Sequence, residues 1–498
     1  MAGRIVVIGA GVGGLVAAMI LAARGRDVLV VEKEAAAGGK LRTLKVSGRQ
    51  IDVGPTVLTL RSVFEEIFHA SGLELGEYVS MRRATVLARH FWSETENLDL
   101  FADRDQSADA IGDFAGAAAA RGFRAFCTHA RSVYETMNPL FIRAERPTPT
   151  GMVSAGGLKG LKGLWSSAPF TTLWDALGDY FPDIRLRQLF GRYATYCGSS
   201  PFHAPATLAL IAHVEQEGVW LVDGGMTAFA AALTKAAEAS GAEVRTGCAV
   251  VGIDVDASGR VTSVRLSSGE SIAASGVVSN ADVGALVAGE FGDDVRKAVP
   301  YDAMLPRSLS AATWAISADV GDFPLAHHTV FFSRSSKQEF ADLFDRGRPP
   351  VDPTVYLCAS DRTDAGRLNL GHGGDERIFS IVNAPADGGR SLASRKEQNT
   401  CLRSMLTTLE RCGLKPTIRD MTHSGPSEFA RLCPATEGAI YGMASHGWTA
   451  SFRRPGVRSV VPGLYLAGGS VHPGAGLPMA ALSGRTAALA LLADQPLT

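Results

Sequence analysis

The first 32 residues place short apolar runs and glycines in the order of a strand, a turn, a helix and a second strand. Residues 4–8 form an apolar, β-branched run that predicts a buried parallel strand, and residues 27–32 predict another. Residues 9–14 supply the glycines of a turn, and residues 15–24 are rich in Ala and Leu, which is typical of a helix. The pattern therefore predicts a βαβ unit, and its four glycines argue against a signal peptide or a membrane span.

The rest of the chain contains four segments that differ in their pattern of hydrophobic and polar residues. Residues 64–219 have a mostly helical pattern, and residues 218–282 combine helix and strand patterns, with strands expected at 243–255 and 261–266. A second mixed segment covers residues 301–425, and glycine-rich apolar sequence returns at residues 463–490. We therefore expect a nucleotide-binding domain made of residues 1–75, 218–290 and 426–498. Residues 76–217 and 291–425 are expected to form an interrupting substrate domain.

Composition narrows the class of protein. The chain has 498 residues, of which 46% are hydrophobic and 20% charged, as expected for a globular protein of two or more domains. Its net charge of −1 offers no strong field for nucleic acid, so no nucleic-acid partner is expected. Seven cysteines without a C-x-x-C pair favour a reducing compartment over a disulfide framework or a structural zinc site.

The first turn carries a dinucleotide-binding pattern, Gly9-x-Gly11-x-x-Gly14, between the expected strand and helix. Gly9 permits the tight turn, Gly11 lets a pyrophosphate approach the backbone, and Gly14 lets the helix pack against the strand. The helix N-terminus adds free N–H groups and a partial positive charge. Glu32 ends the second strand, where its carboxylate is placed to accept hydrogen bonds from ribose hydroxyls.

A second glycine motif indicates which dinucleotide binds. Gly39 and Lys40 lie in A-G-G-K-L-R just past Glu32, and Gly54 and Pro55 lie in D-V-G-P-T at residues 52–56. The first motif resembles that of the FAD-containing amine oxidase and desaturase superfamily, and the second resembles the superfamily's segment along the flavin ring. The resemblance implies FAD, with Lys40 pairing with the pyrophosphate.

The C-terminal block G-L-Y-L-A-G-G-S-V-H-P-G-A-G-L at residues 463–477 is the most specific stretch. A strand is expected to lead into Gly468 and Gly469, whose lack of side chains lets the backbone approach a ligand. A helix is expected to start near Pro478, so Leu477 and Met479 would lie at an N-terminus that can stabilise negative charge on a reduced flavin. We expect all four to contact the cofactor.

This block resembles the C-terminal signature of the bacterial carotenoid desaturases, the phytoene dehydrogenase family. Other matches run along the chain, among them S-N-A-D at residues 279–282 and F-R-R-P at residues 452–455. Val471 departs from the small or hydroxylated residue usual there, which puts one flavin-edge hydrogen bond in doubt. Residues 190–196 are most similar to 1-hydroxycarotenoid 3,4-desaturases. The resemblance implies an α/β fold, with a Rossmann-like FAD-binding domain and an interrupting α+β substrate domain. It implies an FAD-dependent oxidoreductase that introduces a C–C double bond into an acyclic carotenoid.

Neither a proton acceptor nor a metal site can be assigned from the sequence. A flavin accepts hydride from one carbon while the neighbouring carbon loses a proton. The candidates near residue 220 are Glu215, Glu217, His213 and Asp223, each more plausibly structural, so the catalytic residues stay unassigned. Aromatic residues that could line a polyene tunnel, or simply pack in the core, are Phe190, Tyr193, Tyr196, Phe202 and Trp220. His327-His328 lacks a third ligand at usable spacing, so no metal is expected.

An insoluble substrate raises the question of how it reaches the site. In G-L-K-G-L-K-G-L-W at residues 157–165, Leu158, Leu161 and Leu164 share one helical face with Trp165, opposite the lysines. This pattern fits either an element in the membrane interface or a surface loop with some buried leucines. We therefore expect a cytoplasmic protein in peripheral contact with the inner face of the membrane.

Three other functions share some of these motifs. A phytoene desaturase would perform the same chemistry on a less unsaturated substrate. A flavin amine oxidase shares the N-terminal motifs, but the block at residues 468–477 argues against it. A non-enzymatic flavoprotein-like chaperone of prenylated proteins would bind a dinucleotide without turnover. The oligomeric state and the final electron acceptor stay open.

Overall fold

A five-stranded parallel sheet forms the centre of one part of the molecule. The computed structural model describes residues 3–154, 156–157, 170–300, 306–368 and 375–496. The sheet has the order β19-β13-β1-β2-β9, and every neighbouring pair is parallel. Its strands are β1 (Ile5–Ile8), β2 (Val28–Val31), β9 (Glu243–Arg245), β13 (Gly276–Ser279) and β19 (Leu464–Leu466). All but β9 are buried along their whole length, as expected for a parallel sheet covered on both faces.

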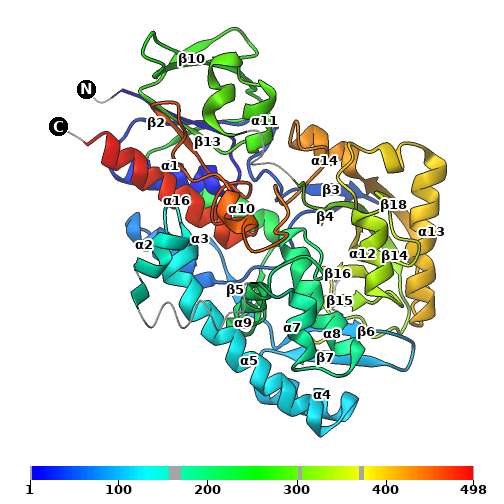
Figure 1. Cartoon of the computed structure of the whole chain (residues 1–498). Coiled ribbons are helices and arrows are strands. Elements are labelled where there is room, and N and C mark those ends of the chain that lie inside the picture. The colour runs from blue at the N-terminus through cyan, green and yellow to red at the C-terminus, as the bar shows by residue number, and fades with distance from the viewer. Residues whose placement is uncertain (1–2, 155, 158–169, 301–305, 369–374, 497–498) are drawn as a thin grey trace.

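Helix α1 (Val12–Ala23) lies beside this sheet and packs against both α10 (Met226–Ala239) and α16 (Leu477–Asp494). Figure 1 shows α1 and α16 side by side near the two chain termini. They approach so closely that a side chain at Gly484 would collide with the carbonyl of Gly13. The antiparallel strands β10 (Val250–Val255), β11 (Val261–Leu266) and β12 (Ser271–Ala273) form a separate small sheet.

A seven-stranded mixed sheet, order β18-β14-β17-β16-β15-β6-β7, forms the second part (Figure 1). Only the β15–β6 pair is parallel. The long helix α13 (Arg395–Arg411) packs its buried residues on this sheet, and α5 (Ala117–Met137) belongs to a core cluster with several of its strands. The strands are β6 (Val86–Phe91), β7 (Asn97–Phe101), β14 (Ser310–Asp319), β15 (His328–Phe331), β16 (Val355–Ala359), β17 (Glu376–Ala384) and β18 (Thr417–Ser424).

Shorter elements complete the described chain. Two small antiparallel pairs join β3 with β4 and β5 with β8. These strands are β3 (Thr43–Val46), β4 (Arg49–Asp52), β5 (Met81–Arg83) and β8 (Trp220–Val222). The helices are α2 (Arg61–Ala70), α3 (Leu75–Tyr78), α4 (Arg104–Ala115), η1 (Asn138–Ile142), α7 (Leu173–Gly178), α8 (Ile184–Gly191), η2 (Arg192–Cys197), η3 (Ala206–Ala209), α9 (Leu210–Glu217), α11 (Val283–Ala288), η4 (Asp293–Ala298), α12 (Ser336–Phe344), η6 (Arg390–Leu392), α14 (Pro426–Leu432) and α15 (Ala450–Arg453).

The structure confirms the N-terminal βαβ unit and corrects two expectations. The first helix begins at Val12, so Gly13 and Gly14 belong to its first turn and not to the loop before it. The mostly helical pattern expected for residues 64–219 is wrong at residues 81–101, where β5, β6 and β7 lie. β6 pairs with its neighbour β7 and also with β15, far away along the chain, and strand preference depends on such packing partners as well as on the local sequence.

The membrane expectations are only partly addressed by the structure. Apart from Gly157, the segment 157–165 lies outside the described residues. Among the helices that are described, none combines the length and the apolar character that a membrane crossing requires.

Candidate active site

The carboxyl ends of the parallel strands bring motifs from distant segments of the chain to one edge of the sheet. Gly9 follows β1, Glu32 follows β2, Asn280 follows β13, and Gly468 lies two residues past β19. In open parallel sheets, ligands bind at this edge. Gly9 and Gly468 have φ of +92° and +108°, which a residue with a side chain rarely adopts.

Asn280 fills the space between the glycine turns from the two ends of the chain. Its Nδ2 donates to the carbonyl of Gly9 at 3.4 Å. A Cβ atom at Gly11 would lie 2.7 Å from Asn280 Nδ2, and one at Gly13 would lie 2.6 Å from Oδ1. A Cβ at Gly468 would lie 3.0 Å from the same Oδ1. Side chains at these three positions would crowd the Asn280 amide, so the glycines leave room for a protein side chain as well as for a ligand, a role that the motif S-N-A-D did not reveal.

Two helices present uncapped N-termini to this edge. The Ncap residues of α1 and α16 are Gly11 and Gly476, and neither helix has a side-chain cap or an acidic residue in its first turn. In contrast, the carboxylate of Asp52 caps α10, because it accepts hydrogen bonds from Met226 N at 2.6 Å and Thr227 Oγ1 at 2.8 Å. The N-termini of α1 and α16 are thus free to bind negative charge.

The carboxylate of Glu32 is buried and held by the backbone. Oε2 accepts a hydrogen bond from Ala10 N at 2.7 Å, and Oε1 accepts one from Glu34 N at 2.9 Å. Each oxygen keeps a second lone pair. The geometry therefore leaves Glu32 able to accept hydrogen bonds from a ribose while it also fixes the first glycine turn.

The basic residues of the second glycine motif face the same space. Lys40 Nζ donates to the carbonyl of Ile440 at 2.6 Å and retains further donors for an anion. Arg42 lies over the ring of Phe429, with Cζ 5.9 Å from the centroid. Burial lowers the pKa of Arg42, and its Nη2 has no hydrogen-bond partner among the residues that the structure describes. A buried guanidinium nitrogen without a partner fits a site for a phosphate.

One continuous cavity of about 670 Å³ joins all of these features. Its size falls in the range of ligand and cofactor sites. The expected site residues that line it are Gly9, Gly11, Glu32, Gly39, Lys40, Gly54, Pro55, Gly468, Gly469 and Leu477. Gly14 and Met479 are not among its lining residues. Gly14 instead packs against the Gly9 carbonyl, and a side chain there would collide with it.

Hydrogen bonds connect the C-terminal block to a neighbouring loop. Buried Arg454 donates to the carbonyls of Gly469 at 3.1 Å and Met443 at 2.6 Å, which explains the R-R-P motif near residue 454. The side chain of Val471, which departs from the family pattern, is fully buried, and Val471 is not among the residues lining the cavity. Its neighbours Gly469 and Ser470 do line it.

Comparison with known proteins identifies the family. The sequence profile of the flavin containing amine oxidoreductases matches residues 12–304. Hydroxyneurosporene desaturase from Rubrivivax gelatinosus is 49% identical over 98% of this chain and 93% of its own, and that from Cereibacter sphaeroides is 43% identical over 99% and 98%. The chain belongs to the flavin containing amine oxidoreductases.

Within this flavoprotein family the chain groups with carotenoid desaturases, and its cofactor is FAD. A solved oxidoreductase from Methanosarcina mazei superposes with a TM-score of 0.63 over 97% of this chain and 99% of its own, at 16% identity. That likeness shows the fold alone, an α/β FAD-binding fold. The free helix N-termini, the glycine turns and the orphaned Arg42 nitrogen fit a flavin dinucleotide.

The cavity continues from the glycine turns into the second part of the molecule. There its walls are mostly aromatic and aliphatic, formed by Trp174, Phe332, Phe340, Tyr356, Phe379 and Ile381. Of the aromatic residues expected from the sequence, only Tyr196 lines this cavity, among the residues that the structure describes. Phe190 and Tyr193 are buried in the core, Phe202 packs against Trp174, and Trp220 lies under the guanidinium of Arg61.

The four candidate proton acceptors lie in different environments. Glu217 and Asp223 are exposed, and His213 packs against Tyr134. Glu215 is buried, and its carboxylate accepts hydrogen bonds from the hydroxyls of Tyr193, at 2.6 Å, and Tyr196. Burial raises the pKa of Glu215. In the described part of the chain none of the four lines the large cavity, but Glu215 lines a small cavity beside it.

The expectation that His327 and His328 lack a third neighbour is corrected by the structure. Cys358 Sγ lies 3.6 Å from His327 Nε2, and the three side chains form a compact group. Burial raises the pKa of Cys358 to about 12 and lowers the pKa of both histidines. We propose no metal there.

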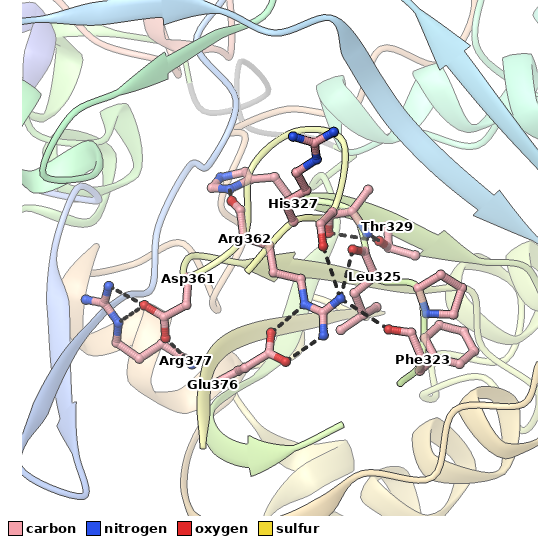
Figure 2. A network of polar contacts seen from close by, with 12 residues as sticks. Phe323, Leu325, His327, Thr329, Asp361, Arg362, Glu376 and Arg377 are labelled. Carbon is pink, nitrogen blue, oxygen red and sulfur yellow. Dashed lines mark hydrogen bonds and ion pairs between the residues drawn. The ribbon is translucent and has the colours of Figure 1, made fainter. Parts of the chain in front are cut away.

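A buried ion pair fixes the loop that carries these histidines (Figure 2). Arg362 forms two hydrogen bonds with Glu376, at 2.6 and 2.7 Å, and both side chains are less than one-tenth exposed. Arg362 Nη1 also donates to the carbonyls of Phe323 and Leu325, and its own carbonyl lies 2.9 Å from His327 Nδ1. The network therefore sets the position from which β15 starts, and with it His328.

Proposed function

We propose that this flavoprotein is a carotenoid desaturase that introduces the 3,4 double bond of a 1-hydroxy acyclic carotenoid. The observation that carries the proposal is the single cavity that joins the glycine cradle to an aromatic hydrocarbon-lined space. The sequence identity to hydroxyneurosporene desaturases, which extends over nearly the whole chain, supports the substrate class. It favours this function over an amine oxidase, a phytoene desaturase or a chaperone of prenylated proteins.

The residues of the chain would bind the cofactor, position the substrate and exclude water from the reacting bond. When bound, FAD accepts the hydride that leaves the carbon chain. The N-terminus of α1, with Lys40 and Arg42, would hold the diphosphate, the N-terminus of α16 would lie at the flavin, and Glu32 would hold the ribose. Phe332, Phe379 and Ile381 would hold the polyene and keep water from the reacting bond.

We assign the cofactor contacts to Gly9, Gly11, Glu32, Gly39, Lys40, Gly54, Pro55, Gly468, Gly469 and Leu477, all of which line the cavity. Gly14 supports helix packing, and Met479 lies in the first turn of α16 without lining the cavity. We keep the division into an FAD-binding domain (1–75, 218–290, 426–498) and a substrate domain (76–217, 291–425). The substrate's insolubility supports peripheral contact with the inner face of the membrane.

The test is to supply the purified holoprotein with a 1-hydroxycarotenoid or with phytoene, each in liposomes, and to record absorption spectra. Each added conjugated double bond shifts the carotenoid absorption to longer wavelength. We expect the shift with the 1-hydroxycarotenoid only. A shift with phytoene alone would contradict the proposal, and protein that stayed apart from floated liposomes would contradict membrane contact.

A further inference from the structure

A chain of polar side chains reaches the cavity next to the segment that follows Pro55. Thr56 Oγ1 lies 2.6 Å from the hydroxyl oxygen of Tyr356, and that oxygen lies 2.7 Å from Nδ1 of His328. Thr56 and Tyr356 line the large cavity, and Thr56 directly follows the Gly54-Pro55 pair assigned to the cofactor. The polar chain therefore lies beside the place where the reacting bond must be.

Arg192 adds a cation to the same wall. Its Cζ lies 5.5 Å from the ring centroid of Tyr356 and 6.0 Å from that of Tyr196. These three residues separate the large cavity from the small one, because they line both. The small cavity, about 20 Å³, has room for about one water molecule. A polar layer thus stands behind the wall at this point.

A ligand that consisted only of hydrocarbon would not account for these polar groups in the cavity wall. A polar group that is buried against hydrocarbon loses its hydrogen bonds to water, and Thr56, Tyr356 and His328 replace these only by the bonds that they make with one another. His328 lines the small cavity behind the wall, is 4% exposed, and its Nε2 has no hydrogen-bond partner within the described ranges. An arginine, a tyrosine and a threonine beside the segment that carries Gly54 and Pro55 therefore suggest a ligand with a polar end.

Other polar side chains also line the cavity, among them Gln188, Thr313 and Asn383, and the acidic one in this part of the wall, Glu339, does not fit this role. Glu339 also lines the cavity, but its carboxylate accepts hydrogen bonds from Ser333 Oγ at 2.8 Å, Thr354 Oγ1 at 2.7 Å and Thr354 N at 3.0 Å. Its hydrogen-bonding capacity is largely met by the protein. Glu339 also lies on α12, and not on the segment that carries Gly54 and Pro55.

We propose that Thr56, Tyr356 and Arg192 form a subsite for the terminal hydroxyl of the carotenoid and thereby select the 3,4 bond. This inference rests on the proposed function. In a 1-hydroxycarotenoid only one carbon separates the hydroxyl-bearing carbon from the reacting bond, so the hydroxyl must lie beside the flavin. Arg192 donates to the hydroxyl oxygen, and Tyr356 or Thr56 accepts a hydrogen bond from the hydroxyl group. A carotenoid without the hydroxyl leaves Arg192 without this acceptor, so it binds less well and in no fixed register.

The test compares kcat/KM of the holoenzyme for a 1-hydroxycarotenoid and for the same carotenoid without the hydroxyl. We expect the wild type to prefer the hydroxylated substrate by about tenfold or more. Tyr356→Phe and Thr56→Val should each lower this ratio by about tenfold. Tyr193→Phe is the matched control, because it removes a buried hydroxyl bonded to Glu215 that does not line the large cavity; its ratio should equal that of the wild type.

The outcomes separate this inference from the proposed function. If both variants bind flavin and keep the wild-type ratio, the hydroxyl subsite is wrong while the desaturase function stands. If the wild type converts neither carotenoid and neither carotenoid bleaches its flavin, the proposed function fails, and the subsite fails with it. Since Thr56→Val removes only one hydroxyl at nearly constant volume, it decides the question even if Tyr356→Phe loses its flavin.

Discussion

Replacing Glu32 with Gln should weaken FAD binding by about 10- to 100-fold. In the wild type the two carboxylate oxygens accept hydrogen bonds from Ala10 N and Glu34 N at 2.7 and 2.9 Å. Gln presents an NH2 group in place of one oxygen, so one backbone N–H faces another donor and the ribose loses its charged acceptor. A hydrogen bond to a charged group contributes about 1.5–3 kcal/mol, and about 1.4 kcal/mol corresponds to a tenfold change in Kd.

The assay is a titration of apoprotein with FAD, followed by the quenching of flavin fluorescence. Glu243→Gln is the matched control, since Glu243 lies on the neighbouring strand β9 and forms only exposed ion pairs with Arg4 and Arg245. Exposed pairs contribute little, so this variant should keep its Kd within about threefold. A Glu32→Gln protein that folds and binds FAD with the wild-type Kd would refute the role of Glu32 at the ribose.

Three further changes test the folded structure. Glu376→Gln leaves the buried Arg362 without its charged partner, so the free energy of unfolding in urea should fall by about 3–5 kcal/mol; a loss under about 1 kcal/mol would contradict this. Burial lowers the pKa of His90 and of His472 from 6.5 to about 4, so the unfolded state gains protons as pH falls between these values. The urea concentration at the unfolding midpoint should therefore decrease as the pH is lowered below 6.5, with a loss in the free energy of unfolding of up to about 1.4 kcal/mol per histidine per pH unit. Equal midpoints at pH 7 and pH 5 would disprove this prediction. Gly14→Val should abolish flavin binding through a collision with a backbone carbonyl, which absorbance at fixed protein concentration would detect.

Most of the cofactor half of the site could be predicted from the sequence, because it depends on backbone conformations that only certain residue types adopt. Gly9 and Gly468 occupy left-handed conformations, and such requirements restrict the residue type at a fixed position. The role of Asn280 was not accessible, although its motif was noted. Asn280 acts through a side chain that touches glycines some 270 residues away along the chain, Gly9 among them, and spacing along the sequence does not encode such contacts.

The substrate half of the site was harder to predict from the sequence, since its walls come from a sheet assembled from distant segments. The cavity is lined by Ala311 and Thr313 on β14 and by Phe379, Ile381 and Asn383 on β17. These positions alternate along each strand, so one face of the sheet forms the wall. Alternation shows which residues share a face, but only the strand order shows that this face adjoins the flavin. For this reason Phe190 and Trp220 were plausible tunnel residues, and the structure places them elsewhere.

The central claim is that glycine turns from the two ends of the chain hold one flavin against a hydrocarbon cavity. Its most direct test is anaerobic mixing of the purified protein with a 1-hydroxycarotenoid while the absorbance of oxidised flavin is followed. We predict that the flavin absorbance bleaches as the carotenoid absorption moves to longer wavelength, and that primary amines leave it unchanged. Flavin that is bleached by amines and not by the carotenoid would contradict the account.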